Sequence, residues 1–298
     1  MSAVMAPGAV PRFEPRLMRR RLTGTIFLGL CLAAIGFLLL ALLLLLYDVL
    51  VRGLPWLDLQ FITGVPSRFP ERAGILPALA GSLQIGLITG LLTFPTGVAA
   101  AIYLTEYATD SRLNRLLQTN ISNLAGVPSI IYGIFGLALF VRLAGFGNVL
   151  FAGALTLMLV ILPIVIIATI EALKAVPDAQ REGAYALGAT RWQMVRRSVL
   201  PAAAPGILTG IILAMARAIG ETAPLVVTGA FVFVTFLPNP LSGGYTVLPV
   251  QVFSWAVRPQ DEFRGIAAAA IIVVVVLMLI LNGMALLIRA RLSRNIQW

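Results

Sequence analysis

Six long apolar runs, separated by shorter polar segments, constrain this chain more than any other feature of its sequence. An α-helix needs about 20 mostly apolar residues to cross the hydrocarbon core of a bilayer, and each run is long enough to do so. The mean hydropathy is +0.97 and only 11% of the residues are charged, which is too few to cover a water-soluble domain of this size. The sequence therefore predicts an all-α integral membrane protein with six membrane-spanning helices.

The positions of the spans follow from the apolar runs, and we expect them near residues 22–50, 75–103, 121–141, 149–170, 203–230 and 265–288. The first run is too long for the core of a signal peptide and has no small-residue cleavage site, so it is expected to stay as a span. Pro and Gly interrupt residues 51–74 and 232–263, which are predicted to be loops. The predicted organisation is a basic tail, a first span with its loop, a membrane domain and a short tail, at residues 1–22, 23–73, 74–290 and 291–298.

The distribution of Lys and Arg predicts the orientation of these spans, since cytoplasmic segments carry the excess of positive charge. With a cytoplasmic N-terminus, the inside segments hold 15 of the 22 Lys and Arg residues, the outside segments hold 6, and Arg217 lies within a span. Both termini are therefore expected in the cytoplasm of a bacterial-type plasma membrane. In the last outer loop, Trp255 is expected at the head-group level as part of an aromatic belt, with contact to a partner as the alternative.

Composition also excludes several kinds of catalytic site. The chain has no His, so it can form neither a Ser-His-Asp triad nor an imidazole metal site. Cys31 is the single cysteine, and Lys174, the single lysine, does not lie in a phosphate-binding GxxxxGK[ST] loop. We expect no catalytic residue, no metal and no cofactor in this chain, and any ATP must be hydrolysed by another chain.

The net charge of +10 raises the possibility of nucleic-acid binding. The arginines, however, flank the apolar spans instead of forming one basic stripe, so they are interpreted as a topology signal beside membrane lipid. No nucleic-acid partner is expected.

The polar segment 171–201, between the fourth and fifth spans, is predicted to form helix, turn and helix. Asp178 is expected to cap the first short helix, and Gly188 suits the left-handed position that ends it. Thr190 and Gln193 are spaced as a capping box for the second helix, and Pro201 is expected to stop that helix. The prediction is a compact knob on the cytoplasmic side, while an ordinary amphipathic loop remains the alternative.

Several motifs in this chain resemble those of ABC importer permeases. Glu182-Gly183-Ala184, Gly188 and Leu200-Pro201 are similar to the EAA loop of that family, EAA-x3-G-x9-I-x-LP, with Gly183 in place of Ala and Ser198 in place of Ile. The segments LPALAGSLQIGLITGLLTFPTGVAAAIYLTEYA, ISNLAGVPSIIYGIFGLALF and ARAIGETAPL look like the A-type membrane subunit of phosphate-specific importers. The resemblance covers roughly residues 74–290.

This resemblance implies a type I ABC importer permease fold and a coupling role for the loop. In the family the EAA loop docks into a cleft on the ATP-hydrolysing subunit and transmits its motion, so its residues are the candidate coupling residues: Glu182, Gly183, Ala184, Gly188, Leu200 and Pro201. The implied partners are a second permease subunit in a heterodimer, two ATP-binding subunits that hold ATP and Mg, an external phosphate-binding protein and inorganic phosphate.

Arg217 is the one basic residue inside a span. It lies roughly 21 Å along the fifth span, and an arginine at such a depth costs roughly 2.5–3.5 kcal/mol, so it is expected to face the protein interior or a wet cavity. Glu221 is one turn further on the same face and can pair with it. Gly220 is expected to let another helix come close, and Pro224 to loosen the helix just beyond. A planar guanidinium suits phosphate, so Arg217, Gly220 and Glu221 are candidates for the substrate path, and a purely structural ion pair is the alternative.

Three function classes remain open on the residues alone. They are a permease subunit of an ATP-driven importer, a self-contained channel or secondary transporter, and an intramembrane enzyme. The spans lack the paired Asp or Ser-Lys dyad of an intramembrane enzyme, and a secondary carrier usually has more spans, with inverted repeats. Composition does not show whether the substrate is phosphate, sulfate or molybdate; only the resemblance indicates phosphate.

Overall fold

The computed structural model describes residues 17–109, 111–230 and 233–293. Most of the predicted N-terminal tail, residues 1–16, and the last residues of the predicted C-terminal tail, 294–298, lie outside the described residues. Within the described ranges every regular element is helical, which confirms the predicted all-α class. The longer helices are α1 (Leu17–Gly53), α3 (Leu76–Ile102), α4 (Arg112–Ala125), α6 (Leu150–Lys174), α9 (Leu200–Gly220) and α12 (Asp261–Ser293).

Shorter helices connect or extend these elements. The short α-helices are α2 (Leu59–Thr63), α5 (Ser129–Gly136), α7 (Asp178–Ala186), α8 (Arg191–Met194), α10 (Ala223–Val227) and α11 (Leu248–Ala256). The π-helical segments are η3 (Tyr103–Tyr107), η4 (Leu137–Leu143) and η5 (Val195–Val199), which extend α3 and α5 and join α8 to α9. Two 3₁₀ turns, η1 (Leu54–Trp56) and η2 (Pro70–Arg72), lie beside α2.

Among the described residues, five helical stretches are long and apolar enough to cross a membrane, and the bent pair of α4 with α5 and η4 brings the number to six. The chain divides into two compact units, Met1–Asp48 and Val49–Trp298. In the first unit, α1 is apolar on all sides, as expected of a helix surrounded by lipid. The second unit contains the remaining spans and both candidate sites.

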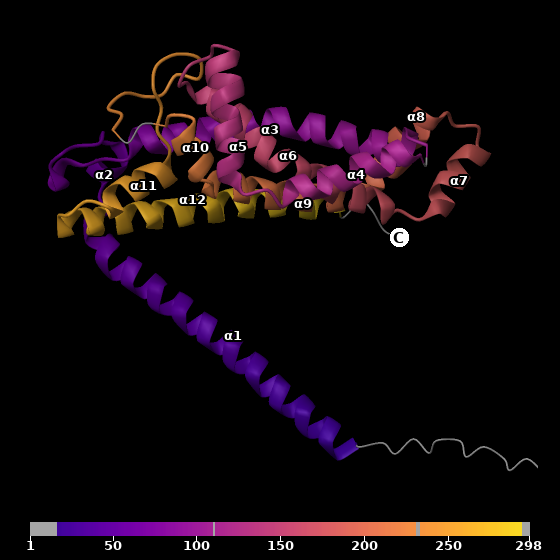
Figure 1. Cartoon of the computed structure of the whole chain (residues 1–298), viewed down its shortest axis with the longest axis horizontal. Helices are drawn as coiled ribbons and strands as arrows, with labels where there is room; N and C mark the ends of the chain where they lie inside the picture. The colour runs from indigo at the N-terminus through magenta and orange to yellow at the C-terminus, as the bar shows by residue number, and fades with distance from the viewer. Residues whose placement is uncertain (1–16, 110, 231–232, 294–298) are drawn as a thin grey trace, which may run out of the picture. The chain divides into compact units, whose positions relative to one another are not determined.

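In the second unit, α3, α6, α9 and α12 run side by side (Figure 1). The knob helices α7 and α8 lie at one end of this bundle, and α2 and α11 lie at the opposite end (Figure 1). Close approach of small residues holds α6 against α9: a Cβ added at Gly206 would lie 2.8 Å from the Cβ of Ala172. Gly210 meets Ala168 in the same way one turn later. Such small-residue contacts allow helices to pack tightly without a hydrophobic driving force.

The third span is not the single helix predicted for residues 121–141. The chain forms α4 first, breaks at Gly126-Val127-Pro128, and continues as α5 and η4 with a bend of 102°. Pro128 has no N–H and keeps Val127 out of the helical region, so the helix must restart there. Much of the polar stretch expected to separate two spans is therefore helical, within α4 (Arg112–Ala125).

The last predicted loop, residues 232–263, contains a buried helix. Its second half forms α11, which packs along α12. Trp255 is 1% exposed and its ring lies 6.0 Å from the ring of Phe61. The expected aromatic-belt position of Trp255 is therefore wrong: the side chain belongs to the core, because the helix turns it towards α2 instead of towards the bilayer surface.

Candidate functional site

The segment 171–201 folds as the predicted helix, turn and helix, formed by α7 and α8. Gly188 has φ +76°, a conformation that L side chains rarely adopt, and its N–H donates to the carbonyl of Tyr185 at 2.9 Å. The next N–H, of Ala189, donates to Ala184 O at 3.1 Å. The turn thus satisfies the carbonyls at the end of α7, as predicted for a glycine at this position.

The second knob helix starts at the predicted capping box. Gln193 N donates to Thr190 Oγ1 at 3.3 Å, and Thr190 N donates to Gln193 Oε1 at 2.9 Å. At the first helix the prediction was wrong, because Pro177 occupies the N-cap position and Asp178 is the first residue of α7. The carboxylate of Asp178 instead accepts a hydrogen bond from Arg181 Nη1 at 3.2 Å.

Pro201 does not stop the second helix. A continuous helical stretch runs from Arg191 to Gly220, through α8, η5 and α9, and crosses the bundle. Proline removes one backbone donor, and the wider π-turn of η5 just before it accommodates the changed hydrogen-bonding pattern. The knob is thereby joined to the fifth span by unbroken helix.

The predicted coupling residues occupy two different places. Glu182, Gly183 and Gly188 are exposed on the knob, and Ala184 is half-buried beneath it. Leu200 and Pro201 lie at the start of α9 instead of at the tip. Leu187 was not among the predicted coupling residues, although it is 90% exposed beside the turn. Leu187 directly precedes Gly188, and a residue beside a tight turn is usually exposed, so its exposure could have been predicted from the sequence.

An ion pair that was not predicted from the sequence connects the knob to the bundle. Arg181 Nη2 lies 2.9 Å from Glu106 Oε1, and Arg181 Nε donates to Glu106 Oε2 at 3.4 Å. The side chains are 16% and 5% exposed. Arg181 also donates to the carbonyls of Leu173 at 2.9 Å and Val176 at 2.7 Å. The hydrogen bond to Glu106 raises the pKa of the Arg181 guanidinium, so this group stays charged.

The second candidate site is the pair of Arg217 and Glu221, which forms as predicted. Arg217 Nε donates to Glu221 Oε1 at 3.2 Å. The guanidinium is 47% exposed and the carboxylate 16% exposed. Glu221 is the single partner of Arg217 within the described ranges, so the terminal Nη groups remain available for another anion.

The surroundings of this pair differ from the prediction. The helix ends at Gly220, and Glu221 has extended backbone, so the break precedes Pro224, which lies in the first turn of α10. A Cβ at Gly220 would meet nothing within 4 Å in the described part of the chain. The expected close approach of another helix at Gly220 is therefore not made within this chain, and that side of α9 is open.

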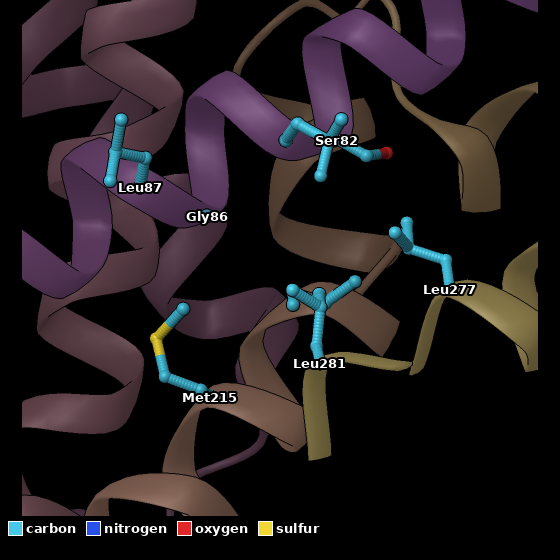
Figure 2. Close-up of a pocket in the computed structure, with 8 residues that line it drawn as sticks. Ser82, Gly86, Leu87, Met215, Leu277 and Leu281 are labelled. Atoms are coloured by element: carbon cyan, nitrogen blue, oxygen red, sulfur yellow. The ribbon is translucent and has the colours of Figure 1, made fainter. Parts of the chain in front are cut away.

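An apolar hollow of about 360 Å³ lies between α3, α9 and α12 (Figure 2), and Arg217 is not among the residues that line it. Figure 2 shows Met215, Leu277 and Leu281 around it, with Ser82 as the polar member of the lining. An anion loses its hydration without compensation in such surroundings. The hollow is therefore unsuited to a charged substrate, whereas Arg217 presents an exposed guanidinium outside it.

The family model described as "Binding-protein-dependent transport system inner membrane component" matches residues 93–294. The chain belongs to this family. For an inner membrane component of this kind, a multi-pass membrane location and a permease fold follow, and both agree with the apolar helices described above.

Among relatives of this inner membrane component, "Phosphate transport system permease protein PstA 1" of Mycobacterium tuberculosis (strain CDC 1551 / Oshkosh) is 35% identical over 256 residues, which cover 83% of this chain and 82% of the relative. "Phosphate transport system permease protein PstA" of Yersinia pestis is 36% identical over 276 residues, which cover 91% of this chain and 92% of the relative. "Probable ABC transporter permease protein YqgI" of Bacillus subtilis (strain 168) is 37% identical over 214 residues, which cover 71% and 72%.

Solved structures confirm the fold of the permease. A chain of a bacterial alginate ABC transporter, in complex with an alginate pentasaccharide-bound periplasmic protein, has a TM-score of 0.63 at 17% identity and covers 94% of this chain and 98% of that chain. A chain of the MetNI methionine ABC transporter in an inward-facing conformation has a TM-score of 0.62 at 17% identity and covers 73% and 95%. The predicted type I ABC importer permease fold is confirmed.

Proposed function

We propose that this chain is the membrane permease subunit of an ATP-driven importer of inorganic phosphate. The observation that carries the proposal is the identity of 35–36% to phosphate transport system permease proteins over 83–91% of the chain. The chemistry of the open side of α9 supports the same substrate. A guanidinium with free Nη groups can donate two parallel hydrogen bonds to a phosphate, in competition with Glu221.

The importer needs further subunits, because this chain has no phosphate-binding loop for ATP. We infer a heterodimer with a second permease subunit, two copies of an ATP-binding subunit that hold ATP and Mg, and an external phosphate-binding protein. The knob is the contact with an ATP-binding subunit. Its exposed Leu187 and Glu182 suit a cleft that offers an apolar floor and a basic rim.

We further infer that the knob end of the bundle is cytoplasmic, as are both termini. The Lys and Arg distribution supports this orientation. The arrangement of the bundle is compatible with it, since α7 and α8 lie at the end opposite to α2 and α11 (Figure 1). The segments 51–74 and 233–263 then face the external binding protein.

The proposed substrate is tested by uptake of radiolabelled phosphate into vesicles that hold the whole complex. We expect ATP-dependent uptake that unlabelled phosphate competes away and that equal concentrations of sulfate or molybdate leave unchanged. Competition by sulfate or molybdate assigns the permease to another oxyanion. Uptake that persists without the ATP-binding subunits assigns it to the class of self-contained transporters.

The proposed orientation is tested by labelling a single introduced cysteine. Ser242 is exposed in the segment that precedes α11, and Cys31 is the one native cysteine. In a chain carrying Cys31→Ser and Ser242→Cys, a membrane-impermeant thiol reagent is expected to react from the outer side of intact cells. Reaction in inside-out vesicles only would reverse the topology.

A further inference from the structure

The end of α3 is the part of the bundle that holds the knob most closely. Here the helix widens into the π-segment η3, where Ala108 N donates to Tyr103 O at 2.8 Å across five residues. Glu106 lies in this segment and is 5% exposed. The π-helical turn is rare and frequently occurs at functional sites, and this one forms the last turn of the helical stretch Leu76–Tyr107.

Two arginines, one from each knob helix, reach this segment. Arg181 of α7 binds Glu106 through two hydrogen bonds, at 2.9 and 3.4 Å. Arg191 of α8 places its guanidinium carbon 5.3 Å from the centre of the Tyr107 ring. We call these four residues, Glu106, Tyr107, Arg181 and Arg191, the clasp. It connects two consecutive residues of the bundle to both helices of the knob.

The clasp is more than the knob needs in order to fold. The Gly188 turn and the Thr190–Gln193 capping box are local, and they already define the two helices. The bond between Arg181 and Glu106 instead bridges 75 residues of sequence. A buried charge pair costs desolvation and adds little net stability compared with apolar side chains. A role beyond stability therefore accounts better for it.

Arg181 is oriented from several sides, which makes this connection rigid. Its Nη groups also donate to Leu173 O and Val176 O at the end of α6, at 2.9 and 2.7 Å. A displacement of α7 therefore moves Glu106 and the end of α6 together. Because α3 and α6 pack along their lengths, the displacement is carried into the bundle (Figure 1).

We propose that Glu106 and Arg181 are positioning residues that transmit the movement of the knob to α3, with η3 as the deformable joint. This proposal rests on the proposed function, since it requires an ATP-driven partner that moves the knob. The force from ATP hydrolysis then reaches the bundle by two routes. One is the unbroken helix from Arg191 to Gly220, and the other is the clasp.

The test uses the whole complex in proteoliposomes, with phosphate uptake and ATP hydrolysis measured on the same sample. Glu106→Gln keeps the shape of the side chain and removes its charge, and Arg181→Lys keeps a charge but loses the forked hydrogen bonds. We expect both complexes to retain the ATP-binding subunits while phosphate imported per ATP falls by about tenfold, within the range typical of coupling between sites. The matched control is Glu171→Gln, which removes an exposed pair with Lys174 at the same end and should leave the ratio unchanged.

Every outcome decides between a positioning and a structural role. A wild-type ratio of uptake to hydrolysis in either assembled variant overturns the proposal. Failure of both variants to retain the ATP-binding subunits assigns the pair to structure alone and also overturns it. Conversely, Glu106→Asp, which restores the charge, is expected to recover part of the ratio. If the wild-type complex imports no phosphate, the proposed function is wrong. If the wild-type complex imports phosphate and the variants have the same uptake per ATP, only the proposed role of the clasp is wrong.

Discussion

Gly188→Val is expected to uncouple ATP hydrolysis from phosphate uptake while the chain still inserts in the membrane. The residue has φ +76°, and a β-branched side chain in that conformation costs roughly 1–3 kcal/mol, so the turn between α7 and α8 must change. Apart from the neighbours of Gly188 in the chain, an added Cβ meets no atom of the described residues within 4 Å, so the effect is expected to come from the backbone. We expect uptake per ATP to fall by at least about tenfold, measured in vesicles with the whole complex.

Two variants separate this effect from general destabilisation. Gly145→Val imposes comparable backbone strain at φ +70°, in the turn before α6, where an added Cβ also meets nothing within 4 Å in the described ranges. It should leave the uptake per ATP unchanged in the complex that assembles. Gly188→Asn should remain coupled, because asparagine tolerates the left-handed conformation. Normal, substrate-stimulated hydrolysis and uptake in Gly188→Val would falsify the assignment of the knob to coupling.

Arg217→Lys is expected to abolish most phosphate uptake although the complex assembles. Lysine keeps the positive charge but loses the planar fork that can bind two phosphate oxygens. Hydrogen bonds to charged groups contribute about 1.5–3 kcal/mol, so the loss corresponds to roughly a ten- to hundredfold reduction in uptake. The matched control is Arg264→Lys, in an exposed pair with Asp261, which should have no effect on transport.

The alternative, a pair that only fixes packing, predicts a different result for the exchanged pair. Arg217→Glu with Glu221→Arg keeps both charges on the same face of the helix. A purely structural pair then works in either order, whereas a substrate role requires the guanidinium at its native depth. Phosphate uptake at the wild-type rate by the exchanged chain would rule out the substrate role of Arg217.

Features that depend on neighbouring residues were predicted well. The membrane class, the first, second, fourth and sixth spans, and the turn at Gly188 follow from apolar runs and from the conformational freedom of glycine. The pairing of Arg217 with Glu221 also follows, because residues four apart are neighbours on a helix. In each case a short piece of chain contains all the groups that determine the structure.

The effects of two prolines on their helices were predicted less well. Pro128 separates two helices at 102°, whereas Pro201 lies inside a continuous helix. The local loss of a hydrogen bond is the same at both sites. The difference lies in the backbone around each proline: Gly126 and Val127 leave the helix before Pro128, whereas the π-turn of η5 accommodates Pro201.

The sequence by itself determined that this chain crosses a membrane, resembles ABC importer permeases and forms a helix-turn-helix knob between its fourth and fifth spans. Only the tertiary structure decided that Glu106 holds Arg181, 75 residues away, and that Trp255 packs on Phe61 inside the core. The physical reason is the range of the interactions. Hydropathy, capping and glycine turns act over a few residues, whereas a buried charge or a large aromatic ring takes its partner from whichever segment the packing of the helices brings beside it.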